Sequence, residues 1–529
     1  MRGGRRVLWA LLATATLLFA VVPWSAEAAS KTPKYVFLFI GDGTSVPQVS
    51  AAQIYLGSLK SKEPAMGELS FTRFPYQGMT TTHAADSFIT DSASAITAIA
   101  AGHKTVDGVI NMDPQKKVKY KTIAEFARDK GMKVGVVSSV SIEHATPAGF
   151  YSRSPSRNLY YEIALQIPDS DFHFFGGGGF RQPRGKNGDQ PDVREILRQR
   201  GYKVVEKADE IRALKPSDGK VVAINPVLDR EAALPYAINR KSGMDVGLSL
   251  AEFTAKAIEM LDGPEGFFLH VEGGKVDWAC HANDAASAIH DLLDFDAAVR
   301  EALKFYEKHP DETLIIVTGD HECGGMSMGF AGTRYETYFR VLERQKMSYD
   351  EFAKLVAKYR ESTPKEKARL EDLMPKIGEL FGLRTLKPEE RKALEERSKA
   401  GDAEAALELQ LALTDDEVAQ LQEAFKLSMM GKEERPKDER TYRVYGGYEP
   451  LVVKVTHILN QKAGIGWSSF AHTALPTPVY AIGVGAERFA GYYDNTDIFR
   501  KLAEVMEIDL SKGNVISALP WEELEEIAA

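Results

Sequence analysis

Residues 267–281 read FFLHVEGGKVDWACH, a short apolar run that leads directly into carboxylate and imidazole side chains. Asp277 and His281 are four residues apart, so on a helix they would share one face and bind one ion together. Further along, residues 318–321 read TGDH after a second apolar run, and adjacent ligands suit a loop where a strand ends. Mixed oxygen and nitrogen donors suit zinc, and an oxygen-rich neighbour suits magnesium. Ordinary surface acids would explain either patch alone, but two patches beside apolar runs favour a metal site.

Short apolar runs rich in β-branched residues recur along the chain, at Tyr35–Ile40, Lys133–Ser139, Val221–Ile224, Phe267–Val271, Leu314–Thr318 and Val479–Val484. Helical patterns such as Thr122–Lys130 and Ala285–Tyr306 lie between several of them. Apolar strands that alternate with helices predict an α/β fold, a three-layer α/β/α sandwich with a mostly parallel central sheet. Ligands bind at the carboxyl ends of strands in such folds, and Asp42, Glu272 and Asp320 each follow a predicted strand.

Residues 335–445 interrupt this alternation with a dense mixture of Lys, Arg, Glu and Asp. Residues 414–417 read TDDE, a helix capping box, and Val418, Leu421 and Phe425 follow at helical spacing. We predict a helical insertion between two parts of one core, residues 29–334 and 446–529. Its apolar positions must be buried on the core or on a second subunit, so we expect it at the rim of the site or at a dimer interface.

The first residues have the pattern of a signal peptide. Three arginines precede the apolar run Val7–Val22, and small residues surround a cleavage position near Ala28/Ala29. We predict that residues 1–28 are removed and that the protein is secreted or periplasmic, with no membrane anchor. Removal takes away three Arg and one Glu, so the formal net charge of −9 becomes −11. This charge argues against a nucleic-acid-binding surface.

Only two cysteines, Cys280 and Cys323, occur among 529 residues. A chain of this length can bury a large core, so it does not need a disulfide framework. Each cysteine lies within two residues of a candidate histidine ligand. Soft metal ligands, a local disulfide and buried thiols are therefore all open interpretations.

A nucleophile candidate precedes the metal-ligand patches. Residues 90–102 read TDSASAITAIAAG, a helix of small residues that ends on glycine. Asp91 or Ser92 begins this helix, where main-chain N–H groups favour a bound phosphate or an alkoxide. An ordinary N-cap is the alternative, since Ser and Asp are common caps. Ser94 is a rival nucleophile, but it lies one turn into the helix and is expected to be less exposed.

Six blocks of sequence, in order and with compatible spacing, resemble the alkaline phosphatase family. They are residues 40–43 (IGDG), 91–94 (DSAS), 144–148 (HATPA), 272–277 (EGGKVD), 318–321 (TGDH) and 472–474 (HTA). The resemblance covers most of residues 34–330 and 465–490 and leaves out the insertion. It implies an enzyme that hydrolyses phosphate monoesters, and it implies a homodimer.

The resemblance also implies two zinc ions and one magnesium ion per chain, with Ser92 as the nucleophile that forms a phosphoserine intermediate. Carried over position by position, the zinc ligands are Asp277, His281 and His472 at the first site, and Asp42, Asp320 and His321, with Ser92, at the second. Asp42, Thr146 and Glu272 would bind magnesium. Coordination to zinc lowers the pKa of a serine hydroxyl, so no histidine base is required.

The same resemblance predicts an arginine that binds two phosphate oxygens, because a planar guanidinium donates two parallel hydrogen bonds. The family pattern places it at Arg157, and Arg153 is the alternative. His144 and Trp278 occupy positions that vary within the family, and we expect them to act through bound water rather than as direct ligands.

Two other functions compete with a phosphomonoesterase. A phosphodiesterase or sulfatase of the same superfamily would carry Thr, or a modified Cys or Ser, as nucleophile, and residues 91–93 (DSA) fit neither pattern. A non-catalytic protein that binds phosphate or metal would lack a ligand or the nucleophile, and every expected part is present in this sequence.

Overall fold

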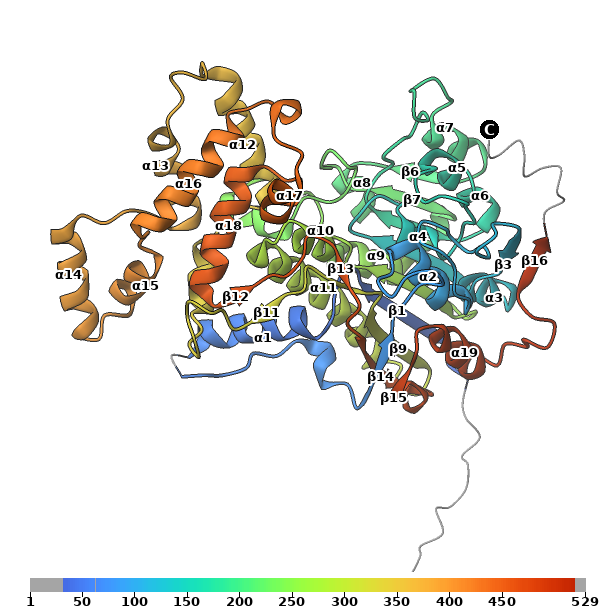
Figure 1. Cartoon of the computed structure of the whole chain (residues 1–529). Helices are drawn as coiled ribbons and strands as arrows, with labels where there is room; N and C mark the ends of the chain where they lie inside the picture. Colours follow the sequence, from blue (N-terminus) through green and yellow to red (C-terminus); the bar gives the residue numbers. More distant parts are fainter. Residues whose placement is uncertain (1–31, 62, 519–529) are drawn as a thin grey trace, which may run out of the picture.

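The computed structural model describes residues 32–61 and 63–518, so the predicted signal peptide lies outside the described residues. A ten-stranded sheet forms its centre (Figure 1). In spatial order the strands are β15 (Gly491–Asp494), β2 (Tyr76–Thr81), β14 (Thr477–Gly483), β9 (Thr313–Gly319), β1 (Tyr35–Gly41), β8 (Phe267–Glu272), β4 (Lys133–Ser138), β5 (Phe174–Gly177), β7 (Val221–Ile224) and β6 (Lys203–Val205). The strands from β9 to β6 run parallel, whereas β14 is antiparallel to both of its neighbours. The predicted mostly parallel sheet is confirmed.

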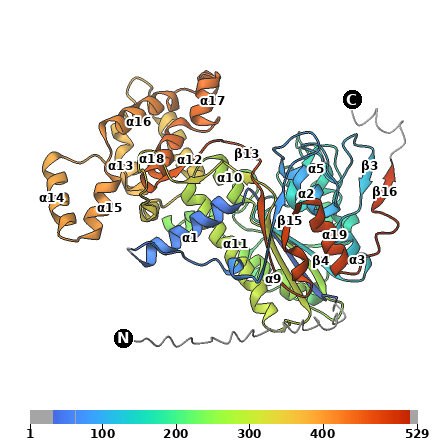
Figure 2. The same cartoon turned by 60° about the horizontal axis from the view of Figure 1, so that its bottom comes forward.

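Helices cover both faces of this sheet, because the side chains of each central strand alternate between two apolar clusters. Phe37 and Phe39 of β1 point to one cluster and Val36 and Leu38 to the other. The first face packs against α1 (Val46–Lys60), α9 (Leu250–Leu261) and α11 (Ala285–Tyr306), and the second against α2 (Ser92–Ala101), α3 (Ile123–Asp129) and α19 (Thr496–Val505) (Figures 1 and 2). This arrangement is the predicted three-layer sandwich.

Short elements at the carboxyl ends of the parallel strands carry the candidate site residues. They are α4 (Ala145–Ala148), α10 (Lys275–His281), β10 (Glu322–Cys323) and β13 (His472–Thr473). The strand pair β10–β13 sets Cys323 opposite His472. Other short helices connect strands at the β6 side of the sheet, namely α5 (Tyr160–Ala164), α6 (Ile167–Ser170), α7 (Val193–Gln199) and α8 (Ala208–Arg212).

A group of helices lies to one side of the sheet, at the left of Figure 1. It comprises α12 (Tyr349–Ser362), α13 (Met374–Phe381), α14 (Pro388–Lys399), α15 (Ala403–Leu411), α16 (Asp415–Ser428), α17 (Glu439–Tyr445) and α18 (Pro450–Ala463). The capping box of α16 is formed, with Thr414 Oγ1 accepting from the Glu417 N–H at 3.2 Å. Helix α18 packs against α12 and α16, although it follows residue 445.

The apolar stripe of α16 is buried within this chain. Leu421 and Phe425 belong to the same cluster as α1 and α11, and half-buried Val418 packs at its edge. These side chains therefore need no second subunit to cover them.

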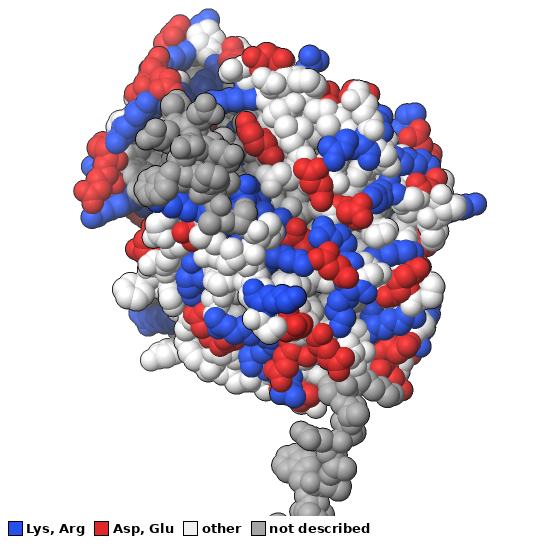
Figure 3. Space-filling model, turned by 90° about the vertical axis from the view of Figure 1, so that its right-hand side faces the viewer, with Lys and Arg blue, Asp and Glu red and all other residues white. Residues whose placement is uncertain are grey.

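The surface carries both signs of charge. On the face shown in Figure 3, Lys and Arg side chains are interspersed with Asp and Glu. Among the described residues, no helix combines the length and the apolar character needed to cross a membrane.

Replacement of Phe425 tests the packing of the helical group. Phe425→Ala should lower the free energy of unfolding by about 3–5 kcal/mol, because it removes a buried ring and leaves a cavity. Val418→Ala is the control and should cost less, since Val418 is smaller and only half-buried. Thermal and denaturant unfolding measure both effects. If both variants lose the same free energy of unfolding, the proposed burial of the α16 stripe is wrong.

Candidate active site

Residues from four distant segments meet at the carboxyl edge of the sheet. Asp42 follows β1, Glu272 ends β8, Asp320 follows β9 and His472 lies on β13. The turn after β1 approaches α10 closely. Gly43 has φ +69°, and a Cβ atom there would lie 2.7 Å from the Cα of Asp277. A side chain at position 43 would thus displace Asp277, which explains why glycine suits this turn.

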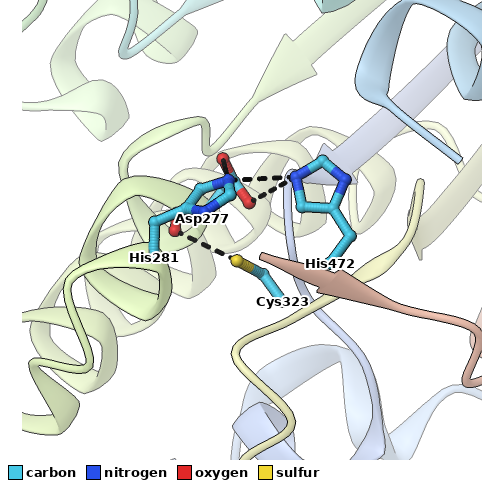
Figure 4. A group of neighbouring side chains, drawn as sticks. All are labelled: Asp277, His281, Cys323 and His472. Atoms are coloured by element: carbon cyan, nitrogen blue, oxygen red, sulfur yellow. Dashed lines mark hydrogen bonds and ion pairs between the residues drawn. The ribbon is translucent and has the colours of Figure 1, made fainter. Parts of the chain in front are cut away.

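The first candidate metal site consists of Asp277, His281 and His472 (Figure 4). Asp277 and His281 share one face of α10, as predicted from their spacing, with His281 Nε2 3.3 Å from Asp277 Oδ2. His472 Nε2 lies 3.4 Å from Asp277 Oδ1 and 3.0 Å from His281 Nε2. Ligand atoms of a tetrahedral zinc ion, bound at 2.0–2.2 Å, would be about 3.3–3.6 Å apart. The observed spacing therefore fits one small cation.

Two main-chain carbonyls orient the imidazole rings of this site. Phe470 O lies 2.7 Å from His281 Nδ1, and Thr90 O lies 2.7 Å from His472 Nδ1. A carbonyl only accepts hydrogen bonds, so each Nδ1 carries the proton and each Nε2 is directed to the candidate metal position. Burial opposes protonation of His281, but the Asp277 carboxylate outweighs it and raises the pKa of His281 to about 9. A bound cation would take the place of that proton.

The second candidate site surrounds His321, which is fully buried. His321 Nε2 lies 3.2 Å from Ser92 Oγ, 3.3 Å from Asp42 Oδ1 and 3.3 Å from Asp320 Oδ2. Burial, together with the neighbouring carboxylates, raises the pKa of Asp42 well above its ordinary value and that of Asp320 to about 7. Carboxylates that repel one another in a dry site favour a bound cation over an empty one.

The third candidate site lies on the other side of Asp42. Carboxylate oxygens of Asp42 and Glu272 and a ring nitrogen of His144 are all within 4.8 Å of one another, and Thr146 is buried on α4 beside them. Burial, followed by the charge of Asp320, raises the pKa of Glu272 to about 8. Within the described residues, both oxygens of Asp42 and Oε1 of Glu272 accept no hydrogen bond. This oxygen-rich set fits magnesium.

Ser92 is the first residue of α2, and Asp91 is its N-cap. Asp91 Oδ1 accepts a hydrogen bond from the Ser94 N–H at 2.9 Å, so the capping role belongs to Asp91. The hydroxyl of Ser92 is thereby free to face His321. Ser94 Oγ instead contacts Thr90 Oγ1 at 2.7 Å and Asp107 Oδ1 at 3.0 Å. The hydroxyl that faces the candidate metal ligands is that of Ser92.

The two candidate arginines have different surroundings. Arg157 Nη1 donates to Asp91 Oδ2 at 2.9 Å, and Arg157 Nη2 lies 3.1 Å from His144 Nε2. Burial opposes ionisation of Asp91, but Arg157 lowers the pKa of Asp91 to about 2. Arg153 instead forms an ion pair with Glu125 and donates to Tyr120 O at 2.8 Å. Only Arg157 contacts residues of the site.

Trp278 is packed between His144 and a buried ammonium group. The Trp278 and His144 rings meet edge to face with centroids 5.8 Å apart. Lys275 Nζ lies 4.6 Å from the Trp278 ring and 2.5 Å from Asp229 Oδ2. Lys275 belongs to the sequence block 272–277 (EGGKVD), but the sequence alone indicated no role for it. Its contact with Trp278 depends on the tertiary position of Asp229.

Comparison with known proteins identifies the family of this chain. A model of the alkaline phosphatase family matches residues 33–379. Alkaline phosphatase 3 of Bacillus subtilis (strain 168) is 30% identical, over 90% of this chain and 90% of its own. The crystal structure of a cold-active alkaline phosphatase from a psychrophilic Shewanella sp. superposes with a TM-score of 0.69 at 26% identity, over 89% of this chain and 99% of that one. A mutant alkaline phosphatase of the Antarctic bacterium TAB5 is described with magnesium in its M3 site. It superposes with a TM-score of 0.58 at 26% identity, over 90% of this chain and 99% of that one. The chain belongs to the alkaline phosphatase family, the metal-dependent hydrolases of phosphate monoesters.

Proposed function

We propose that this enzyme hydrolyses phosphate monoesters through a phosphoserine intermediate on Ser92, at a site that binds two zinc ions and one magnesium ion. The observation that carries the proposal is the position of Ser92 Oγ, 3.2 Å from His321 Nε2. It lies beside buried carboxylates of which both oxygens of Asp42 and Oδ2 of Asp320 accept no hydrogen bond from the described residues.

The three candidate sites suggest how the ions are distributed. Asp277, His281 and His472 would bind the first zinc, and Asp42, Asp320 and His321 the second. Asp42, Glu272 and Thr146 would bind magnesium, and the magnesium described for the TAB5 enzyme supports a third site. A ring nitrogen of His144 lies within 4.8 Å of the ligand oxygens of Asp42 and Glu272, and His144 would act at this third site through a bound water.

The chain's own residues would then carry the reaction. When bound, the metal ions would lower the pKa of the Ser92 hydroxyl and neutralise charge on phosphate oxygens. Ser92 Oγ attacks phosphorus and gives its proton to solvent. The P–O bond to the alcohol breaks, and the alcohol leaves with a proton from solvent. Water then cleaves phosphoserine, which restores Ser92 and releases phosphate. Arg157 donates two hydrogen bonds to the phosphoryl oxygens throughout, because Asp91 holds its guanidinium in place.

Export and dimerisation are also part of the proposal. The pattern of residues 1–28 supports secretion or export to the periplasm, and the family resemblance supports a homodimer. The helices between residues 335 and 445 would form the rim of the site rather than supply chemistry. Tyr448, just beyond them, packs near Phe470, whose carbonyl orients His281.

Ser92→Ala tests the nucleophile. Turnover of p-nitrophenyl phosphate should fall by about four orders of magnitude, because the group that forms the intermediate is lost while the metal ligands remain. Brief incubation with labelled phosphate, followed by peptide mapping, should place the label on Ser92 in the unaltered enzyme. Label on Ser94 would overturn the assignment.

Arg157→Ala tests the phosphate contact. Inhibition by inorganic phosphate should weaken, and kcat/KM should fall by about one to three orders of magnitude, because a charged bidentate contact is lost. Arg157→Lys should recover little, since an ammonium cannot donate the same pair of hydrogen bonds.

Arg153→Ala is the matched control for Arg157. Arg153 is paired with Glu125 away from the site, so its loss should lower Tm without changing phosphate inhibition. If Arg153→Ala instead loses activity and phosphate inhibition while Arg157→Ala keeps both, Arg153 is the arginine that binds phosphate.

His472→Ala tests the first zinc site. Elemental analysis should show about two zinc ions per chain in the unaltered enzyme and about one fewer in the variant, with loss of activity. His83→Ala removes an imidazole that is paired with Asp494 elsewhere and should retain full zinc content. Unchanged zinc in His472→Ala would exclude His472 as a ligand.

A further inference from the structure

A cysteine lies beside the first zinc site, in a place that the proposed reaction does not use. Cys323 is fully buried on β10, opposite His472 in the β10–β13 pair. Its sulfur and one ligand atom from each of Asp277, His281 and His472 all lie within 4.8 Å of one another (Figure 4). The hydrogen bond found for the thiol is a long one, 3.6 Å to the main-chain oxygen of Asp277.

The geometry of the other three ligands leaves a place for the sulfur. The two Nε2 atoms of His281 and His472 are 3.0 Å apart, and each lies 3.3–3.4 Å from a different carboxylate oxygen of Asp277, spacings close to those between the ligand atoms of one small tetrahedral cation. A tetrahedral site has a fourth corner, and a cysteine sulfur coordinates zinc at about 2.3 Å. Strand pairing sets Cys323 opposite His472, so the sulfur lies on the side of the site where that fourth ligand would be needed.

A second observation also indicates a bound cation here. Asp277 Oδ1 is buried and accepts no hydrogen bond from the described residues, although it faces His472. Burial of a carboxylate oxygen that accepts no hydrogen bond lowers the stability of the fold unless a cation is bound to it. The cation that satisfies Asp277 would be within reach of Cys323.

We propose that the Cys323 thiolate is the fourth protein ligand of the metal held by Asp277, His281 and His472 in the phosphate-free enzyme. This inference rests on the metal site of the proposed function. The thiol proton passes to solvent as the metal–sulfur bond forms. A soft sulfur ligand favours zinc over magnesium at this position. A zinc ion can expand to five ligands, so coordination by the sulfur would still be compatible with binding of the substrate.

Cobalt substitution tests the inference without relying on activity. The full-length enzyme is stripped with a chelator and reloaded with Co²⁺, and cobalt content is measured by elemental analysis. A sulfur-to-cobalt charge-transfer band should appear in the near-ultraviolet spectrum. Cys323→Ala should lose this band while it retains cobalt bound by the other three ligands. Cys323→Thr serves the same purpose if the alanine variant does not fold.

Cys280→Ala is the matched control. Cys280 is equally buried and precedes His281, but its sulfur is 3.9 Å from Gln48 Nε2 and does not belong to the ligand cluster. This variant should keep the band. A fully cobalt-loaded enzyme without the band would overturn the role of Cys323 alone. A protein that takes up no cobalt would overturn the metal site of the proposed function and Cys323 with it.

Discussion

The central constraint on this structure is that its site brings together four buried carboxylates that repel one another. They belong to Asp42, Glu272, Asp277 and Asp320. Burial and mutual repulsion raise the pKa of Asp42, Glu272 and Asp320, whereas the nearby imidazoles hold that of Asp277 well below its ordinary value, against the effect of burial. Such a cluster is costly without cations. We infer that metal ions contribute to the stability of this part of the fold as well as to catalysis, since binding that favours the folded chain also stabilises it.

The parallel sheet makes this concentration of charge possible. Strands β1, β8 and β9 are neighbours and end at the same edge, so each delivers one carboxylate to a common point. The apolar residues of these strands are buried on both faces, which fixes the register of the sheet and hence the positions of the carboxylates. The free energy gained by packing these apolar residues therefore offsets the cost of burying carboxylates that repel one another.

Contacts around the site define the orientation of each group that acts there. The carbonyls of Thr90 and Phe470 select the ring nitrogens of His472 and His281 that face the candidate metal position. Asp91 both caps α2 and forms an ion pair with Arg157, so one carboxylate positions the helix of Ser92 and the guanidinium together. In the proposed reaction, this coupling would direct Ser92 and Arg157, which are far apart in the chain, to the same phosphoryl group.

The sequence alone predicted the sandwich, the six strands chosen from their apolar runs, and the pairing of Asp277 with His281. These follow from local periodicity and from motifs, which short stretches of chain contain in full. It did not predict edge strands such as β2 and β15, whose burial patterns are weak, or the carbonyl contacts, because main-chain groups carry no residue signature. It placed Arg157 ahead of Arg153 and left the state of Cys323 open. Only the tertiary structure shows that Arg157 contacts Asp91, that Arg153 pairs with Glu125 and that Cys323 lies opposite His472, because these contacts join residues that are distant in the chain.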